Sequence, residues 1–513
     1  MIAQIKSIGL IGLSGFSVTV ETDITPEDRI IFDIIGLPDN AVKEAKNRVI
    51  SAIQNSGFKM KTVKIVANLA PADIKKEGSA FDLPIVLSVL CATNQLPPVS
   101  PSYAFLGELS LSGNLRPVKG ILACVAAAKD LGIEKIFVPS ENATEGGVIE
   151  GIEVFGARSI KEICDFLKGE KELFPIKAKI SDYIEKKDQN QADFSEIVGQ
   201  QSAKRACEIA AAGGHNLLLI GPPGTGKSMI AKRMPSILPD MSFDEIIESS
   251  KIYSIAGKLS KKNPLILTRP FVKTTQSLSV AAMTGGGAVP TPGMISLAHN
   301  GVLFLDETPQ FSPAVLNSLR QPLEDNTVTV SRVRQSLTYP SLFMLICAMN
   351  PCPCGKFGNP DLNCTCTPSQ ISKYINRISG PLLDRLDLQV ELPPVPIQDI
   401  KNAAPAESSY EIKKRVNKAR EIQRERFKKS GITCNAKMTP RQVRFLAKHR
   451  MTDSAVTMLD SIFSKLMLSM RAYDKIIKIS QTIADLEGKD SIESAYVAEA
   501  VFFRSLDKKY WNK

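Results

Sequence analysis

The hydrophobic pattern divides the chain into two regions that alternate strands with helices and a third that is helical. Residues 15–21 alternate apolar and polar side chains with the period of two of a half-buried strand. Residues 82–93 and 120–131 place Leu, Val and Ala at helical spacing, and a further helix is expected after Asp39, a residue type that caps helix N-termini. These elements predict an α/β domain over residues 1–170.

The next boundaries follow from composition. Residues 171–193 are rich in Lys, Glu, Asp and Gln and poor in large apolar groups, which indicates a linker. A second α/β domain is predicted over residues 194–395, where a cluster of prolines ends it. Residues 396–513 have helical periodicity and almost no strand pattern, so they predict a helical domain; within it, residues 411–429 (EIKKRVNKAREIQRERFKK) form a long basic helix. We expect no membrane span, because no apolar run reaches about 18 residues.

The clearest chemical pattern is a loop that follows a short apolar strand, residues 216–220, and precedes a helix start at residues 229–234. The loop is Gly221-Pro222-Pro223-Gly224-Thr225-Gly226-Lys227-Ser228, which fits G-x-x-x-x-G-K-[ST]. In such a loop, backbone N–H groups and the N-terminus of the following helix bind phosphates. We therefore expect ATP here, with Lys227 on its β- and γ-phosphates and Ser228 on Mg²⁺. A glycine turn that binds nothing is the alternative, and the flanking strand and helix disfavour it.

Two further apolar strands end in polar residues suited to ATP hydrolysis. Residues 301–307 end in Asp306, expected to position Mg²⁺, and Glu307, expected to polarise the attacking water as general base. Residues 342–350 end in Asn350, placed to bind the γ-phosphate or that water. Two solvated charges at a strand end would be the alternative for the acids, but the phosphate loop upstream disfavours it.

Arg385, which lies in a largely apolar segment, is the candidate for an arginine that acts on a neighbouring subunit's ATP. Arg385 lies in residues 380–388, far along the chain from the phosphate loop, as an arginine finger would. An intrachain salt bridge to Asp384 or Asp387 is the alternative. Arg332 is the second candidate finger.

The ten cysteines divide into a cluster and six scattered residues. The scattered ones lie in apolar surroundings, as in a reduced cytoplasmic protein. The cluster has the spacing C-x-C-x9-C-x-C and consists of Cys352, Cys354, Cys364 and Cys366. Four thiolates across a hairpin would hold one tetrahedral Zn²⁺. Four free thiols in a reducing compartment are the alternative, and an iron–sulfur site fits less well.

Several of these motifs together resemble the magnesium-chelatase-like AAA+ ATPases. The segments that carry the resemblance are residues 198–200, 221–228, 296–307 and 348–355. The resemblance implies ATP and Mg²⁺ as cofactors, a ring that is usually a hexamer, and a role for Arg471 as the second sensor arginine on a helical lid. Asn350, Glu307 and Arg385 keep the catalytic roles given above.

Residues 75–84 and 105–120 resemble the proteolytic domain of Lon, and this combination is similar to the YifB/ComM family. In that alignment the serine nucleophile of Lon falls on Ala80 and its lysine on Leu122, so no activated nucleophile is expected. Ser79 and Lys119 would form a shifted dyad as the alternative. We prefer a protease-like fold without proteolysis, kept for assembly or nucleic-acid contact.

The family resemblance implies a motor on DNA, since ComM members are helicases that drive branch migration in natural transformation. The net charge of +11 and the basic helix would supply phosphate contacts, unless that helix is only a solvated face. A protein-remodelling or chelatase-type subunit and a Lon-type protease are the alternatives. The chain departs from the family at Val272-Lys273-Thr274-Thr275-Gln276, where relatives read Arg-x-Pro-His-His after Arg-Pro-Phe. We expect this change to alter substrate contact and to leave the ATP site unaffected.

Overall fold

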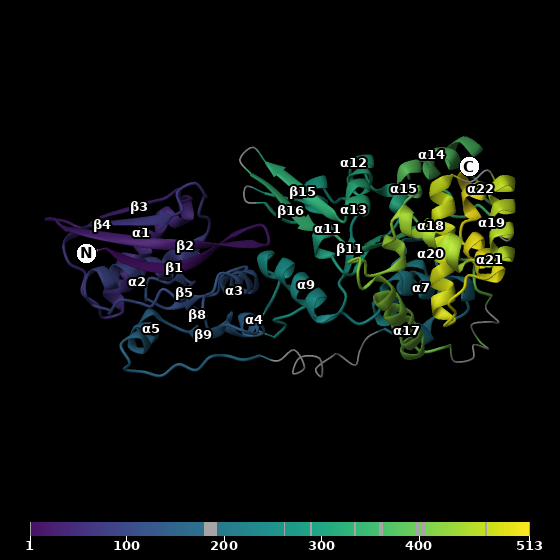
Figure 1. Cartoon of the computed structure of the whole chain (residues 1–513). Coiled ribbons are helices and arrows are strands. Elements are labelled where there is room, and N and C mark those ends of the chain that lie inside the picture. The colour runs from purple at the N-terminus through teal and green to yellow at the C-terminus, as the bar shows by residue number, and fades with distance from the viewer. Residues whose placement is uncertain are drawn as a thin grey trace. The chain divides into compact units, whose positions relative to one another are not determined.

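Seven strands form a mixed sheet in the N-terminal part of the chain, in the order β3-β4-β2-β1-β5-β8-β9 in this computed structural model (Figure 1). The structure describes residues 2–178, 192–260, 262–287, 290–332, 335–358, 363–396, 401, 406–466 and 469–511. β2 pairs antiparallel with β1 and β4, whereas the other neighbouring strands are parallel. The strands are β1 (Ala3–Ile11), β2 (Ser14–Pro26), β3 (Ile31–Ile35), β4 (Val63–Ala70), β5 (Tyr103–Phe105), β8 (Lys135–Pro139) and β9 (Glu153–Ala157), with a small hairpin of β6 (Glu108–Leu109) and β7 (Leu115–Arg116).

Helices cover this sheet, and one lies at each of the three positions that the sequence predicts. They are α1 (Asn40–Asn55), α2 (Asp82–Ala92), α3 (Ile121–Asp130), α4 (Ala143–Gly146) and α5 (Ile160–Leu167). Asp39 caps α1 as predicted, because its side chain accepts a hydrogen bond from the backbone N–H of Val42 at 2.8 Å. Every residue of α2 is buried, so this helix forms the centre of the first hydrophobic core.

The chain folds into two compact units, and each unit consists of two segments of the chain. The first unit contains residues 1–187 and 246–267, and the second contains residues 188–245 and 268–513. The chain enters the first unit within helix α9 (Phe243–Ile255) and returns before Thr268. Residues 246–267 of the predicted ATPase domain, residues 194–395, therefore belong to the first unit. The other predicted limits stay predictions, and most of the predicted linker lies outside the described residues.

The second unit contains a five-stranded sheet whose strands all run parallel, in the order β11-β14-β17-β10-β18. The strands are β10 (Leu217–Ile220), β11 (Phe271–Thr274), β14 (Val302–Leu305), β17 (Met344–Met349) and β18 (Leu388–Glu391). The residues that end β10, β14 and β17 meet at one edge of the sheet, because the carboxyl ends of parallel strands share an edge. Two hairpins lie outside this sheet: β12 (Gly285–Gly286) with β13 (Thr291–Pro292), and β15 (Thr327–Arg332) with β16 (Gln335–Pro340).

Helices surround the parallel sheet and continue into the C-terminal region. Those of the ATPase region are α7 (Gln201–Gly213), α8 (Lys227–Ile237), α10 (Val280–Thr284), α11 (Met294–Leu297), α12 (Pro313–Ser318), α13 (Arg320–Asp325), α14 (Pro368–Ile375) and α15 (Gly380–Leu383). The C-terminal ones are α17 (Ser409–Phe427), α18 (Pro440–Arg450), α19 (Asp453–Leu466), α20 (Met470–Leu486), α21 (Ser494–Phe502) and α22 (Leu506–Trp511).

The C-terminal helices do not form a separate core. α17 packs on α7 and α20 (Figure 1) and on α8. One hydrophobic cluster contains residues of both the sheet, such as Leu217, and the C-terminal helices, such as Ile476. The lid is therefore held to the ATPase sheet by shared apolar burial. None of the helices in the described parts of the chain has the length and apolar content needed to cross a bilayer.

Candidate functional site

The phosphate loop joins the end of β10 to the start of α8. All four residues of β10 are fully buried, so the strand that positions the loop is fixed by apolar packing. Gly224 and Gly226 adopt φ of 81° and 89°, the left-handed region where a side chain would be strained. A Cβ on Gly221 would lie 2.5 Å from the carbonyl oxygen of Leu392, so this position also requires glycine.

Lys227 is the first residue of α8 and its ammonium lies over the loop. Its Nζ donates to the carbonyl oxygens of Gly221 at 2.7 Å and Pro222 at 2.8 Å, and to Oδ1 of Asn350 at 3.1 Å. Burial lowers the pKa of Lys227, and the nearby carboxylates of Asp306 and Glu307 act in the opposite direction. A phosphate beside this amine would add the negative charge that keeps it protonated.

The two residues predicted to hold Mg²⁺ contact each other. Ser228 Oγ donates to Oδ2 of Asp306 at 2.8 Å, which joins the start of α8 to the end of β14. One hydroxyl and one carboxylate beside a phosphate loop are the oxygen donors that Mg²⁺ takes from proteins, with water and phosphate completing its shell. The donor set therefore fits this ion.

Gln276, which lies in the segment expected to contact substrate, hydrogen-bonds to the predicted general base. Glu307 follows β14 with a positive φ of 50°, and its carboxylate accepts a hydrogen bond from Nε2 of Gln276 at 2.6 Å. Lys273 in β11 places its Nζ 3.4 Å from Oδ2 of Asp306. β11 pairs with β14, so Lys273 reaches the acids from the neighbouring strand and Gln276 from the loop that follows it. The divergent segment, expected to leave the ATP site unaffected, therefore contacts both of the predicted acids.

Asn350 completes the group at the carboxyl edge of the sheet. It follows β17, between the phosphate loop of β10 and the acids of β14, because β17 lies between those two strands. Its contact with Lys227 agrees with the predicted position near the γ-phosphate. The structure thus brings together five side chains from three strand ends: Lys227, Ser228, Asp306, Glu307 and Asn350.

Arg385 lies at the opposite edge of this sheet. Its carbonyl oxygen accepts from Nδ2 of Asn216 at 2.8 Å, which places it beside the start of β10. The phosphate loop begins after the end of that strand, about 16 Å further on at about 3.3 Å per residue. Arg385 forms an intrachain ion pair, as the alternative predicted, but its partner is Glu324 in α13.

Arg471 meets the same carboxylate. Its guanidinium lies 4.0 Å from Oε1 of Glu324, and its side chain is 66% exposed. The Arg385 guanidinium lowers the pKa of Glu324, and Arg471 and Arg320 add to this effect. One exposed carboxylate therefore gathers three arginines at the edge away from the phosphate loop. The side chain of Arg332, the second candidate finger, lies outside the described residues.

The four clustered cysteines are brought together as predicted. Their sulfur atoms all lie within 4.8 Å of one another, and none of the ten described cysteines forms a disulfide. The cluster begins two residues after Asn350, so it is attached directly to the ATP site.

Comparisons with known proteins agree with this architecture. Family models match three parts of the chain: subunit ChlI of Mg-chelatase at residues 20–142, magnesium chelatase subunit ChlI at 193–400, and its C-terminal part at 406–504. An uncharacterized protein YifB of Escherichia coli is 42% identical over 501 residues, which cover 97% of this chain and 96% of the relative. Competence protein ComM of Haemophilus influenzae is 40% identical over 510 residues, 98% of each chain.

The chain belongs to the YifB/ComM family. These are magnesium-chelatase-like AAA+ proteins, and the parallel sheet with its helical lid is the AAA+ part. Lon protease 2 of Bacillus subtilis is 27% identical over 124 residues, 24% of this chain and 22% of that protein. A Lon-like α/β domain followed by a P-loop AAA+ domain, as predicted, is therefore the fold of this family member.

The Lon-like part of this YifB/ComM protein arranges other contacts at the protease positions. Ala80 and Leu122 stand at the nucleophile and lysine positions, and Leu122 is fully buried. The hydroxyl of Ser79 bonds to the carboxylate of Glu108, whereas the aliphatic chain of Lys119 packs over Gly257. The contacts described for Ser79 and Lys119 therefore do not support a shifted dyad, which would need the lysine amine at the serine hydroxyl.

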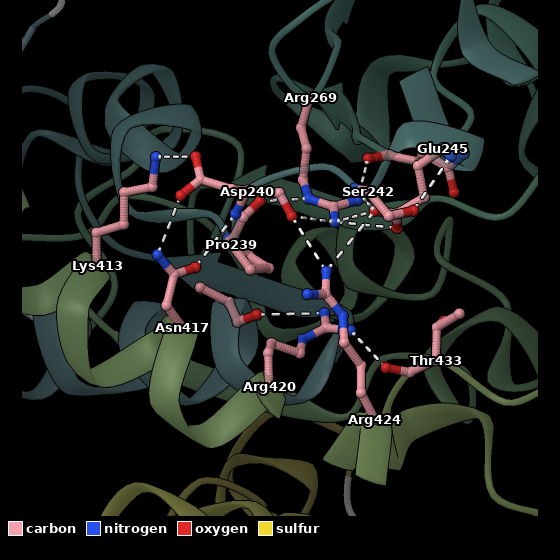
Figure 2. Close-up of polar contacts among 12 residues, drawn as sticks. Pro239, Asp240, Ser242, Glu245, Arg269, Lys413, Asn417, Arg420, Arg424 and Thr433 are labelled. Atoms are coloured by element: carbon pink, nitrogen blue, oxygen red, sulfur yellow. Dashed lines mark hydrogen bonds and ion pairs between the residues drawn. The ribbon is translucent and has the colours of Figure 1, made fainter. Parts of the chain in front are cut away.

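The basic helix α17 uses one face for contacts inside the chain (Figure 2). Lys413, Asn417 and Arg424 lie at spacings of four and seven residues, on one side of the helix. Lys413 and Asn417 bind the carboxylate of Asp240 at 2.6 and 3.1 Å, and Arg424 donates to its backbone oxygen at 3.2 Å. In the same cluster, NH2 of Arg269 donates to both carboxylate oxygens of Glu245 at 3.0 and 2.9 Å.

Other cations of α17 are also paired within the chain. Arg415 bonds to Glu208 at 2.6 Å, and Arg426 bonds to Asp485 at 2.9 Å. Fewer cations of α17 therefore remain available to bind a polyanion than the composition of the helix suggests. These are exposed lysines such as Lys414 and Lys418, and Lys429 is exposed just after the helix.

Proposed function

We propose that the protein is an ATPase whose subunits form a ring, and that it acts as a motor on DNA, as a helicase or branch-migration factor in recombination or natural transformation. The observation that carries the ATPase proposal is the meeting of Lys227, Ser228, Asp306, Glu307 and Asn350 at one sheet edge. ATP supplies the phosphoryl group that water attacks. Lys227 and the loop N–H groups hold its phosphates, Ser228 and Asp306 hold Mg²⁺, and Glu307 takes the proton of the water.

The position of the arginines supports assembly into a ring. Arg385 and Arg471 share Glu324 at the amino edge of the sheet, whereas the phosphate loop is at the carboxyl edge. A single chain thus carries its loop and its arginines on opposite edges. A neighbouring copy would complete the site by turning its amino edge towards the loop, and the arginines would then stabilise charge on the transferred phosphoryl group. A homo-hexamer is the assembly proposed.

DNA as substrate rests on the relatives and the charge. One relative is named a competence protein, and the net charge of +11 favours a polyanion. The lysines left exposed on α17 would contact phosphates. ATP, Mg²⁺ and a Zn²⁺ at the four cysteines are the proposed cofactors, and the cytoplasm is the proposed location.

A second candidate is a chelatase-type or protein-remodelling subunit. It is favoured by the three family models, which are all named for magnesium chelatase subunit ChlI. Proteolysis is disfavoured because Ala80 and Leu122 occupy the positions of the Lon dyad.

A fork-unwinding and three-strand branch-migration assay on the wild type and on Lys227→Ala tests the proposal. The wild type is expected to unwind, with an ATPase that DNA stimulates and that salt suppresses steeply. Lys227→Ala is expected to lose both activities and to keep its circular dichroism spectrum.

The possible results separate the candidates. ATPase without any effect of DNA would overturn the DNA motor and favour the second candidate. Casein degradation would favour a protease, and a wild type that binds no nucleotide at any Mg²⁺ concentration would overturn the whole proposal.

A further inference from the structure

The four cysteine sulfurs are spaced as ligands of a single tetrahedral ion. Cys352 Sγ lies 3.4 Å from Cys354 Sγ and 3.7 Å from Cys364 Sγ, and the last two are 3.6 Å apart. A zinc ion bonded to four sulfurs at about 2.3 Å sets them about 3.8 Å apart. A disulfide would require about 2.05 Å. The spacing therefore fits four thiolates around one metal ion.

The backbone around the cysteines adds hydrogen bonds of the kind that support metal thiolates. The N–H of Phe357 donates to Cys352 Sγ at 3.3 Å. Cys352 itself is fully buried, and Gly355 turns the chain with φ of 78° after the first cysteine pair. Such outer contacts fix the orientation of metal ligands and tune the metal site.

The segment that carries the first two cysteines lies against the phosphate loop. The carbonyl of Met349 accepts from Gly221 N–H at 3.2 Å, and Asn350 accepts from Lys227 at 3.1 Å. Between the cysteine pairs, a Cβ on Gly355 would lie 2.5 Å from Cδ of Pro223. The segment thus touches the loop near its beginning, its middle and its end.

We propose that the four cysteines bind one Zn²⁺, and that this ion holds the segment 349–355 against the phosphate loop so that nucleotide affinity depends on the metal. Without the ion, four thiols replace four metal bonds. The segment then keeps its chain connections to β17 and α14 but loses the cross-link between the two cysteine pairs, so the loop has weaker support at Pro223. This inference rests on the proposed binding of ATP at the loop.

The first test is metal content and nucleotide affinity of the full-length protein. Mass spectrometry of the purified chain is expected to find about one zinc per chain. The double variant Cys364→Ser with Cys366→Ser is expected to lose the zinc and to bind a fluorescent ATP analogue about tenfold more weakly. The control is Cys91→Ser, a buried cysteine whose sulfur already donates to the carbonyl of Pro97, and it should leave both values unchanged.

A pair of glycine variants tests the contact while keeping all the cysteines. Gly355→Ala places a methyl group on Pro223, whereas Gly358→Ala, at an equally strained φ of 80°, meets only Oε1 of Glu391 at 3.9 Å among the residues that the structure describes. Both variants should retain zinc and lose about 1 kcal/mol of stability through the strained φ, and the methyl group on Pro223 adds a further cost in Gly355→Ala. Only Gly355→Ala should weaken nucleotide binding.

The outcomes distinguish this inference from the proposed function. A wild type that binds no nucleotide overturns the proposed function, whatever its metal content. A wild type that binds nucleotide but contains no metal, or contains iron, overturns the zinc site. Zinc that can be removed with no change in affinity, together with equal affinities of the two glycine variants, overturns the hold on the loop.

Discussion

Lys273 lies beside the carboxylate proposed to hold Mg²⁺, so replacing it should tighten the binding of that ion. Its Nζ is 3.4 Å from Oδ2 of Asp306, and the side chain is 45% exposed. At 3.4 Å the Coulomb attraction is about 1.2 kcal/mol in water. Measured interaction energies of exposed ion pairs are about 0.2–1 kcal/mol, because side-chain entropy and screening by salt reduce the Coulomb attraction. Mg²⁺ must displace this interaction when it binds the carboxylate.

For Lys273→Gln we therefore expect the apparent dissociation constant for Mg²⁺ to fall about two- to fivefold, which corresponds to a gain of about 0.5–1 kcal/mol in binding free energy. The assay is ATP hydrolysis at saturating ATP and varied Mg²⁺. Raising the salt concentration should shrink the difference, since exposed charges are screened. Lys414→Gln, on the exposed side of α17, makes the same change in net charge and should leave the Mg²⁺ constant unchanged.

Two results would refute the competition argument. Weaker Mg²⁺ binding in Lys273→Gln would mean that the lysine supports the metal site. A more than tenfold loss of turnover with an unchanged Mg²⁺ constant would mean that it contacts the nucleotide during the reaction.

Three further predictions follow from contacts in the second unit. Glu307→Gln should keep nucleotide binding and lose about 10²–10⁴-fold in turnover, the usual share of a general base; lost binding of a fluorescent ATP analogue would contradict this. Gln276→Ala should lower kcat about tenfold at unchanged KM, because the hydrogen bond that orients Glu307 is removed, and Gln276→His, which restores an N–H donor, should recover most of the rate in the same assay. Asp387→Asn should cost about 3 kcal/mol at pH 7, because Lys475, 2.8 Å from the carboxylate and largely shielded from water, loses its counter-charge and keeps a hydrogen bond to the carbonyl oxygen of Leu386. Although burial alone would raise the pKa of Asp387, Lys475 and His215 hold this pKa well below its usual value. The stability that the ionised carboxylate contributes is therefore present above about pH 4 and is lost on acidification below it. Urea unfolding at several pH values would detect this loss in the wild type and not in the variant.

The sequence predicts the ATP site best where a motif and a strand coincide. β10, β14 and β17 are short apolar runs. Asp306 and Asn350 directly follow β14 and β17, and the phosphate loop that leads to Lys227 follows β10, so parallel pairing brings all three residues to one edge. Gln276 and Lys273 belong to no such motif. They reach the acids through the pairing of β11 with β14, a long-range contact that local pattern does not reveal.

Two other features escaped prediction for different physical reasons. The apolar spacing of α9 is that of any amphipathic helix, so nothing local separates the residues that pack in the first unit from those that stay in the second. The sequence of α17 shows that the helix is basic but does not show which acidic residues pair with its cations. Arg415 and Arg426 pair with acids that lie far away in the sequence.

The return of residues 246–267 to the first unit limits how the protein can be dissected. A recombinant fragment that starts at residue 188 would retain this segment without the partners that bury Ile252 and Leu265. Such a fragment would expose apolar surface and tend to aggregate, while the complementary N-terminal piece would lack a part of its own core. An isolated motor domain should therefore be produced with residues 246–267 replaced by a short polar connection, and its N-terminal counterpart should be supplied with that segment as an appended peptide.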